Sequence, residues 1–142
     1  MTRIDFYVDV EDRLAFACRL AAKALQQSVK VLVYAPAADI AERIDRLLWL
    51  TPPTGFVPHC MAHDRLAAET PVLIARNDET LPHDEFLLNL HDEWPAPFAR
   101  FHRLAEIVSR EDDDKARARS RFRFYRDRGY QIQTHRIGGD GG

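Results

Sequence analysis

Lys30-Val31-Leu32-Val33-Tyr34-Ala35 is the stretch that decides the fold, because it carries a continuous apolar run that is too short for a helix. After Pro36, apolar residues recur at helical spacing up to Leu48. The same order occurs before it, as a strand pattern from Ile4 to Val8 is followed by a helical pattern from Leu14 to Leu25. Strands that alternate with helices favour a parallel sheet, since parallel neighbours need a helical crossover. We therefore predict an α/β fold with a mostly parallel sheet.

The rest of the chain continues this alternation. Short apolar runs predict further strands over 71–75, 86–90 and 104–108, and acids followed by bases predict a helix over 111–128 that ends at Gly129. A closing strand is expected over 130–134. The segment 50–58 contains three prolines and a glycine, so we expect loop or extended chain there. We expect a single domain over 1–137, followed by a glycine-rich frayed tail over 138–142.

Composition narrows the class of protein. A chain of 142 residues with 46% apolar and 30% charged residues is typical of one soluble globular domain. No run of about 18 apolar residues predicts a membrane span, and no cationic segment followed by an apolar block predicts a secretory signal. We therefore expect a cytoplasmic protein that does not contact membranes. Its two cysteines, Cys18 and Cys60, are expected to stay reduced.

The motifs of common active sites are missing from the sequence. The first strand–helix turn, 9–12, has three carboxylates and no glycine, and no phosphate-binding motif follows any predicted strand. These acids are better suited to helix capping. His59, Cys60 and His63 could ligate zinc, but the sequence offers no second ligand pair, and we predict a loop with ordinary histidines. No serine or cysteine has the setting of a nucleophile. We predict no catalysis, no cofactor and no metal.

The predicted helix over 111–128 has an unusual charge. Residues 115–128 hold seven of the twenty Lys and Arg residues and one acid, which puts a net charge of about +6 there and about −8 on the rest of the chain. Its cations and its apolar residues form two adjacent stripes, of which the second is predicted to face the sheet. The first comprises Lys115, Arg119, Arg123 and Arg126, and the second Ala118, Phe122, Tyr125 and Gly129. Such a surface fits three roles. It is suited to bind a nucleic acid or an acidic peptide, and it is equally typical of a solvated helix face whose bases complement the helix dipole.

Two large aromatic residues near the middle of the chain also have alternative interpretations. Trp49 ends the second predicted helix, and Phe56 lies in the proline-rich segment. Aromatic side chains beside a loop can anchor a partner protein. They can also belong to the core, and the sequence pattern favours the core.

Several of these segments resemble one known family. The blocks Arg43-Ile44-Asp45-Arg46-Leu47-Leu48-Trp49 and Phe56-Val57-Pro58-His59, the opening Asp5-Phe6-Tyr7 and the segment from Arg119 to Thr134 are similar to the chi subunit of bacterial DNA polymerase III. The resemblance extends from about Ile4 to Arg136. It implies a single-domain, Rossmann-like three-layer fold without a nucleotide site, in a non-catalytic accessory subunit of this DNA-directed DNA polymerase (nucleotidyltransferase) complex.

The resemblance also implies partners and site residues. Chi subunits link the clamp loader to the acidic C-terminal tail of single-stranded DNA-binding protein (SSB) at replication forks, so contact with DNA is mainly indirect. The tail-binding residues of the family map onto Lys115, Arg119, Phe122, Arg126 and Thr134, with Phe122 standing where the family often has a tyrosine. The surface for the psi subunit, another clamp-loader component or a helicase-like protein maps onto Trp49 and Phe56. The residues alone keep a direct single-stranded nucleic-acid-binding module as the alternative function.

Overall fold

The computed structural model describes residues 1–50, 57–79 and 81–138. Its strands are β1 (Arg3–Val10), β2 (Val31–Tyr34), β3 (His59–Met61), β4 (Val72–Ala75), β5 (Phe86–Asn89), β6 (Arg103–Ser109) and β7 (Ile132–Arg136). Its α-helices are α1 (Arg13–Gln26), α2 (Ala38–Leu50) and α3 (Asp112–Asp127), and Ala67–Glu69 and Phe98–Arg100 form short 3-10 turns. No described helix is long and apolar enough to cross a membrane.

The seven described strands are all parallel and form one sheet in the order β3-β4-β2-β5-β6-β1-β7. The α/β fold with a parallel sheet is thus confirmed. The sequence missed β3, because its three residues carry no apolar run and were predicted as loop. They become a strand by pairing with β4, where His59 lies beside Val72. Of the predicted loop over 50–58, Leu50 ends α2, and 51–56 lie outside the described residues, as do residues 139–142 of the predicted tail.

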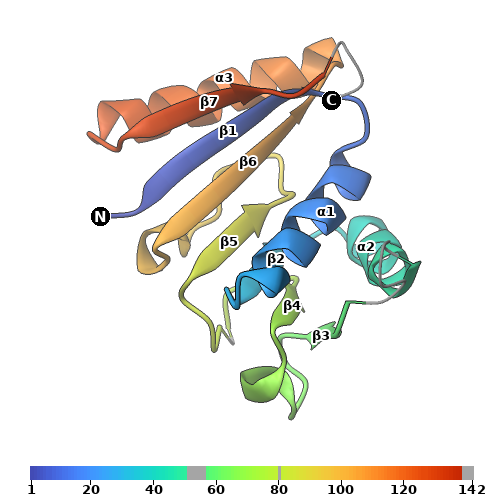
Figure 1. The fold of residues 1–142 in the computed structure, drawn as a ribbon. Helices are drawn as coiled ribbons and strands as arrows, with labels where there is room; N and C mark the ends of the chain where they lie inside the picture. Colours follow the sequence, from blue (N-terminus) through green and yellow to red (C-terminus); the bar gives the residue numbers. More distant parts are fainter. Residues whose placement is uncertain (51–56, 80, 139–142) are drawn as a thin grey trace.

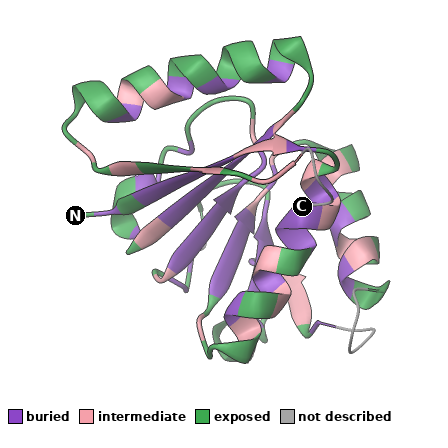
Figure 2. Cartoon of the chain, turned by 45° about the horizontal axis from the view of Figure 1, so that its top comes forward, coloured by how far each residue is buried: buried purple, intermediate pink, exposed green. Residues whose placement is uncertain are grey.

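The sheet is covered on both faces, so the fold has three layers (Figure 1). On one face, α1 and α2 pack over side chains such as Val31, Val33 and Ile107. On the other face, α3 packs over Ile4, Phe6 and Leu104. The inner strands β1, β2, β4, β5 and β6 are mostly buried, whereas the edge strands β3 and β7 are half-buried or exposed, as is the outer side of α3 (Figure 2). This arrangement confirms the Rossmann-like three-layer architecture.

The register of the edge strand β7 decides which of its side chains meet α3. Ile4 pairs with Ile132, Phe6 with Thr134 and Val8 with Arg136. Because side chains alternate between the faces of a sheet, Thr134 and Arg136 lie on the α3 side with Phe6 and Val8.

Candidate functional site

The helix α3 begins and ends as its sequence predicts. Glu111 is the extended N-cap residue, and Asp112, Asp113 and Asp114 occupy the first turn, where acids complement the helix dipole. At the other end, Gly129 has a φ of 83°. Its N–H donates to Arg126 O, and the N–H of Tyr130 donates to Tyr125 O, which is the Schellman pattern. The chain therefore turns sharply from α3 into β7, which brings these two elements side by side.

The buried face of α3 differs in part from the predicted one. Ala118 and Tyr125 are buried as expected, and Phe122 is half-buried. Gly129 is exposed, because it lies beyond the end of the helix and cannot pack on the sheet. The deepest row instead includes two charged residues, Asp114 and Arg121, with 3% and 2% exposure.

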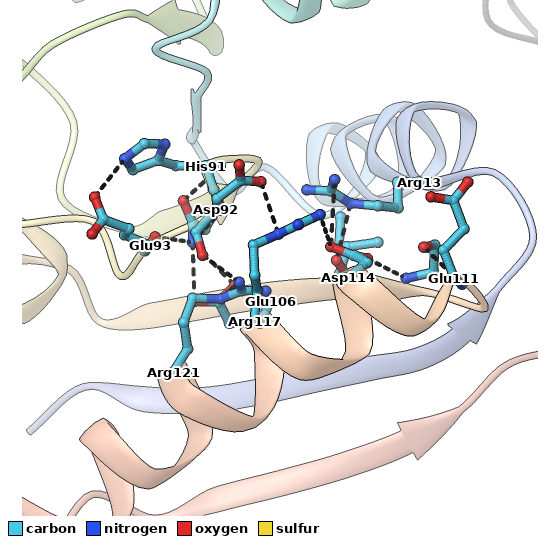
Figure 3. Close-up of polar contacts among 12 residues, drawn as sticks. Arg13, His91, Asp92, Glu93, Glu106, Glu111, Asp114, Arg117 and Arg121 are labelled. Carbon is cyan, nitrogen blue, oxygen red and sulfur yellow. Dashed lines mark hydrogen bonds and ion pairs between the residues drawn. The ribbon is translucent and has the colours of Figure 1, made fainter.

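Arg121 is buried because it forms an ion pair with a buried carboxylate of the sheet. Its Nε donates to Oε1 of Glu106 on β6 at 2.9 Å. Tyr125 OH donates to Oε2 of the same carboxylate at 2.6 Å, and Asn89 Nδ2 lies 3.0 Å from both oxygens. Burial raises the pKa of Glu106, whereas the charge of Arg121 opposes this change. Arg121 is therefore a structural residue of α3 and is not part of a binding surface (Figure 3).

Asp114 ties the start of α3 to the end of β6. Its Oδ2 accepts a hydrogen bond of 2.7 Å from the N–H of Ser109, and its Oδ1 lies 3.8 Å from both Arg13 and Arg117. Arg117 also contacts Asp92 at 3.4 Å (Figure 3). Two of the cations of α3, Arg117 and Arg121, are thus held by acids of the protein itself.

A pocket of about 310 Å³ lies between α3 and the carboxyl ends of β1, β6 and β7. Its apolar part comes from strands and helix together, with Phe6 and Phe122 in edge-to-face contact at 5.4 Å between ring centroids. Its cations are Lys115, Arg119 and Arg136. The lining consists of Phe6, Val8, Asp9, Val108, Ser109, Lys115, Ala118, Arg119, Phe122, Thr134 and Arg136.

Four of the five residues assigned to tail binding line this pocket, namely Lys115, Arg119, Phe122 and Thr134. Arg126 is exposed outside it and pairs with Asp127 at 3.4 Å. Lys115 and Arg119 have exposed side chains that form no ion pair within the described ranges. They are therefore available to an anion from outside the chain.

The one acid of the pocket is already neutralised. Asp9 adopts a left-handed conformation with a φ of 59°, which Asp tolerates better than most residues. Its carboxylate lies 3.1 Å from Arg110 and 3.7 Å from Arg136. Two guanidinium groups thus share one carboxylate, and the net charge at the mouth of the pocket is positive.

From the sequence, residues of α3 and Thr134 of β7 were assigned to this pocket, but its other strand residues were not. Phe6, Val8 and Val108 were expected only as strand residues, and Arg136 was not singled out. The signal for Arg136 was its position two residues after Thr134, since residues i and i+2 of a strand share a face.

The first strand–helix turn and the His-Cys-Met-Ala-His segment have structural roles in the part of the chain that is described. Asp12 caps α1 by accepting from the N–H of Ala15 at 3.2 Å, which confirms the capping prediction for this residue. His59 is held between Val57 O at 2.6 Å and Asp45 at 2.9 Å. No group of three potential metal ligands occurs among the described residues. Cys18 and Cys60 are not joined by a disulfide in the described structure.

Trp49 lies on the surface, so the core position that the sequence pattern favours is wrong. It is 53% exposed in the last turn of α2, and its ring meets His59 edge-to-face at 5.3 Å. The next residue, Leu50, is 74% exposed. Both belong to α2, which lies on the opposite face of the sheet from α3 (Figure 1). Phe56 lies outside the described residues.

Comparison with known proteins gives concordant matches. Residues 1–133 match the family model described as "DNA polymerase III chi subunit, HolC". A relative from Pseudomonas aeruginosa is 41% identical, covering 96% of this chain and 98% of the relative. Relatives from Haemophilus influenzae and Escherichia coli are 31% and 29% identical, covering 86% and 82% of this chain, and 85% and 80% of the relatives. All three carry the name DNA polymerase III subunit chi.

Proposed function

The chain belongs to the DNA polymerase III chi subunit family, and from this premise we propose that it is a non-catalytic adaptor that binds the acidic C-terminal tail of SSB. It links this tail to the clamp loader during DNA replication in the bacterial cytoplasm. The protein contributes binding surfaces to the polymerase complex and no reacting groups of its own.

The observation that carries this proposal is the pair of exposed cations, Lys115 and Arg119, beside an apolar pocket. A peptide that ends in acids, an apolar residue and a free carboxylate needs fixed cations next to an apolar cavity. The guanidinium of Arg119 offers two parallel N–H donors to the terminal carboxylate. Phe6 and Phe122 supply the apolar wall for the last side chain.

The same helix supplies a matched control. Arg123 is exposed on α3, like Arg119, but does not line the pocket. A binding mode that depends only on the overall charge of α3 would treat the two arginines alike. A pocket that captures a carboxylate would not.

Fluorescence anisotropy with a labelled peptide of the SSB tail tests the proposal. Arg119→Ala should weaken binding about ten- to a hundredfold, the usual loss for one charge-assisted contact, whereas Arg123→Ala should change it about twofold or less. Affinity should fall as salt rises. Equal affinity of wild type and Arg119→Ala would refute the site. Tight binding of naked single-stranded DNA at moderate salt, unaffected by the peptide, would favour the nucleic-acid-binding alternative.

The second surface is proposed at the end of α2. Trp49 and Leu50 expose apolar area next to each other on a face remote from α3. We assign this region, together with Phe56, to psi, another clamp-loader component or a helicase-like protein. Two separate surfaces on opposite faces of the sheet would let one molecule hold both partners at once. Co-purification from a cell extract with wild type and Trp49→Ala identifies the partner, and unchanged partners in the variant would refute the assignment.

A further inference from the structure

The outer edge of β7 carries main-chain groups that the fold leaves open. β7 is the last strand of the sheet and pairs only with β1 among the described strands (Figure 1). Gln131 O accepts from Ile4 N, and the N–H of Ile137 donates to Val8 O. Main-chain groups alternate in direction along a parallel strand, so the odd-numbered residues of β7 face β1. The N–H and C=O of Ile132, Thr134 and Arg136 therefore point away from the sheet.

The open edge and the pocket share two residues. Thr134 and Arg136 place their side chains in the pocket on the α3 side and direct their main-chain groups outward. A peptide whose end occupies the pocket therefore passes within reach of these N–H and C=O groups. An extended peptide can pair with such an edge as an added strand.

The charges around this edge select the occupant. Arg136 is 81% exposed, and Lys115 and Arg119 border the same opening. An acidic peptide is attracted to the cations at this edge, whereas a second copy of β7 offers them no acid, since Ile132–Arg136 contains none. The edge thus fits an acidic strand better than self-association.

We infer that an acidic C-terminal peptide binds as an eighth strand along β7, with its terminal carboxylate at Arg119 and its main chain paired with Thr134 and Arg136. This inference rests on the proposed function and specifies how the partner is held. The pocket lies at the carboxyl ends of β1, β6 and β7, so the peptide runs parallel to β7.

Residue-resolved amide hydrogen exchange tests this arrangement on the intact chain. The amides of Thr134 and Arg136 should exchange fast in the free protein and about tenfold or more slowly in the presence of a saturating acidic peptide with a free carboxylate. Gln133 and His135 face β1 and serve as internal controls, because their amides are protected in both states. Bound peptide, shown by anisotropy, with unchanged exchange at Thr134 and Arg136 would overturn the inference and leave the proposed function standing. No binding at all would overturn both.

A second measurement leaves the protein unchanged. N-methylation of successive peptide residues removes one main-chain donor at a time, and only every second residue of an added strand donates to β7. Methylation should therefore weaken binding by about tenfold at one of two adjacent positions and by about twofold or less at the other. Equal effects at adjacent positions would contradict strand pairing.

Discussion

Replacing Arg121 with methionine should lower the free energy of unfolding more than replacing any other Lys or Arg of α3. The side chain of Arg121 is 2% exposed and that of Glu106 is fully buried, and the two form a 2.9 Å contact. In Arg121→Met, the carboxylate keeps only the neutral donors of Tyr125 and Asn89. An unpaired buried charge of this kind costs about 3–5 kcal/mol of the free energy of unfolding. For a chain of this length, the midpoint of thermal unfolding should fall by roughly 10–15 °C.

The pH dependence of this loss identifies its cause. Without Arg121, the pKa of Glu106 is raised further, because burial is no longer opposed by a cation. A carboxyl with a raised pKa destabilises the folded state above that pKa, and the effect vanishes below the ordinary Glu value of about 4.3. The difference between wild type and Arg121→Met should therefore shrink as pH falls from neutrality.

The assay is urea unfolding followed by circular dichroism at several pH values. Glu106→Gln in the Arg121→Met background should recover at least about 1 kcal/mol, since a neutral amide needs no counter-charge. Arg123→Met, an exposed control on the same helix, should change stability by less than about 0.5 kcal/mol. A loss below about 1 kcal/mol in Arg121→Met, or a loss that does not depend on pH, would refute this interpretation of the buried network.

Other predictions concern the remaining buried and exposed groups. Burial would raise the pKa of Asp5, but hydrogen bonds from His135 and Arg103 outweigh it and hold this pKa below its usual value. Its contribution to stability is thus present above about pH 4 and lost as pH falls, and Asp5→Asn should flatten the acid limb of the urea-unfolding profile. Asp12→Ala should cost about 1 kcal/mol in urea unfolding through loss of the cap of α1. Trp49→Ala should leave the unfolding midpoint nearly unchanged, because the residue is half exposed, while abolishing capture of its partner.

Most strands and helices follow from hydrophobic periodicity, because apolar runs and helical spacing report burial directly. The exception is β3, whose residues His59, Cys60 and Met61 are all half-buried. Its conformation is set by β4 alongside it, which a local pattern cannot reveal.

The buried charges show why the buried face of α3 could not be predicted from the sequence of the helix alone. In the sequence, Arg121 cannot be told from the other bases of α3, because its partner Glu106 lies on a separate element, strand β6. A signal was nevertheless present, because Glu106 lies within the apolar run of β6 and a carboxylate in a buried strand needs a cation. The pocket could not be predicted from hydrophobic periodicity, because the register between β1 and β7 decides which side chains line it.

The direct measurement of carboxylate capture is a thermodynamic cycle between Arg119 and the end of the peptide. Binding of the SSB tail with a free carboxylate and with an amidated end is compared for wild type and Arg119→Ala by isothermal titration calorimetry. If Arg119 holds the carboxylate, amidation should weaken wild-type binding about tenfold or more and have little further effect in the variant, a coupling of about 1.5–3 kcal/mol. Equal weakening by amidation in both proteins would contradict the assignment of the pocket.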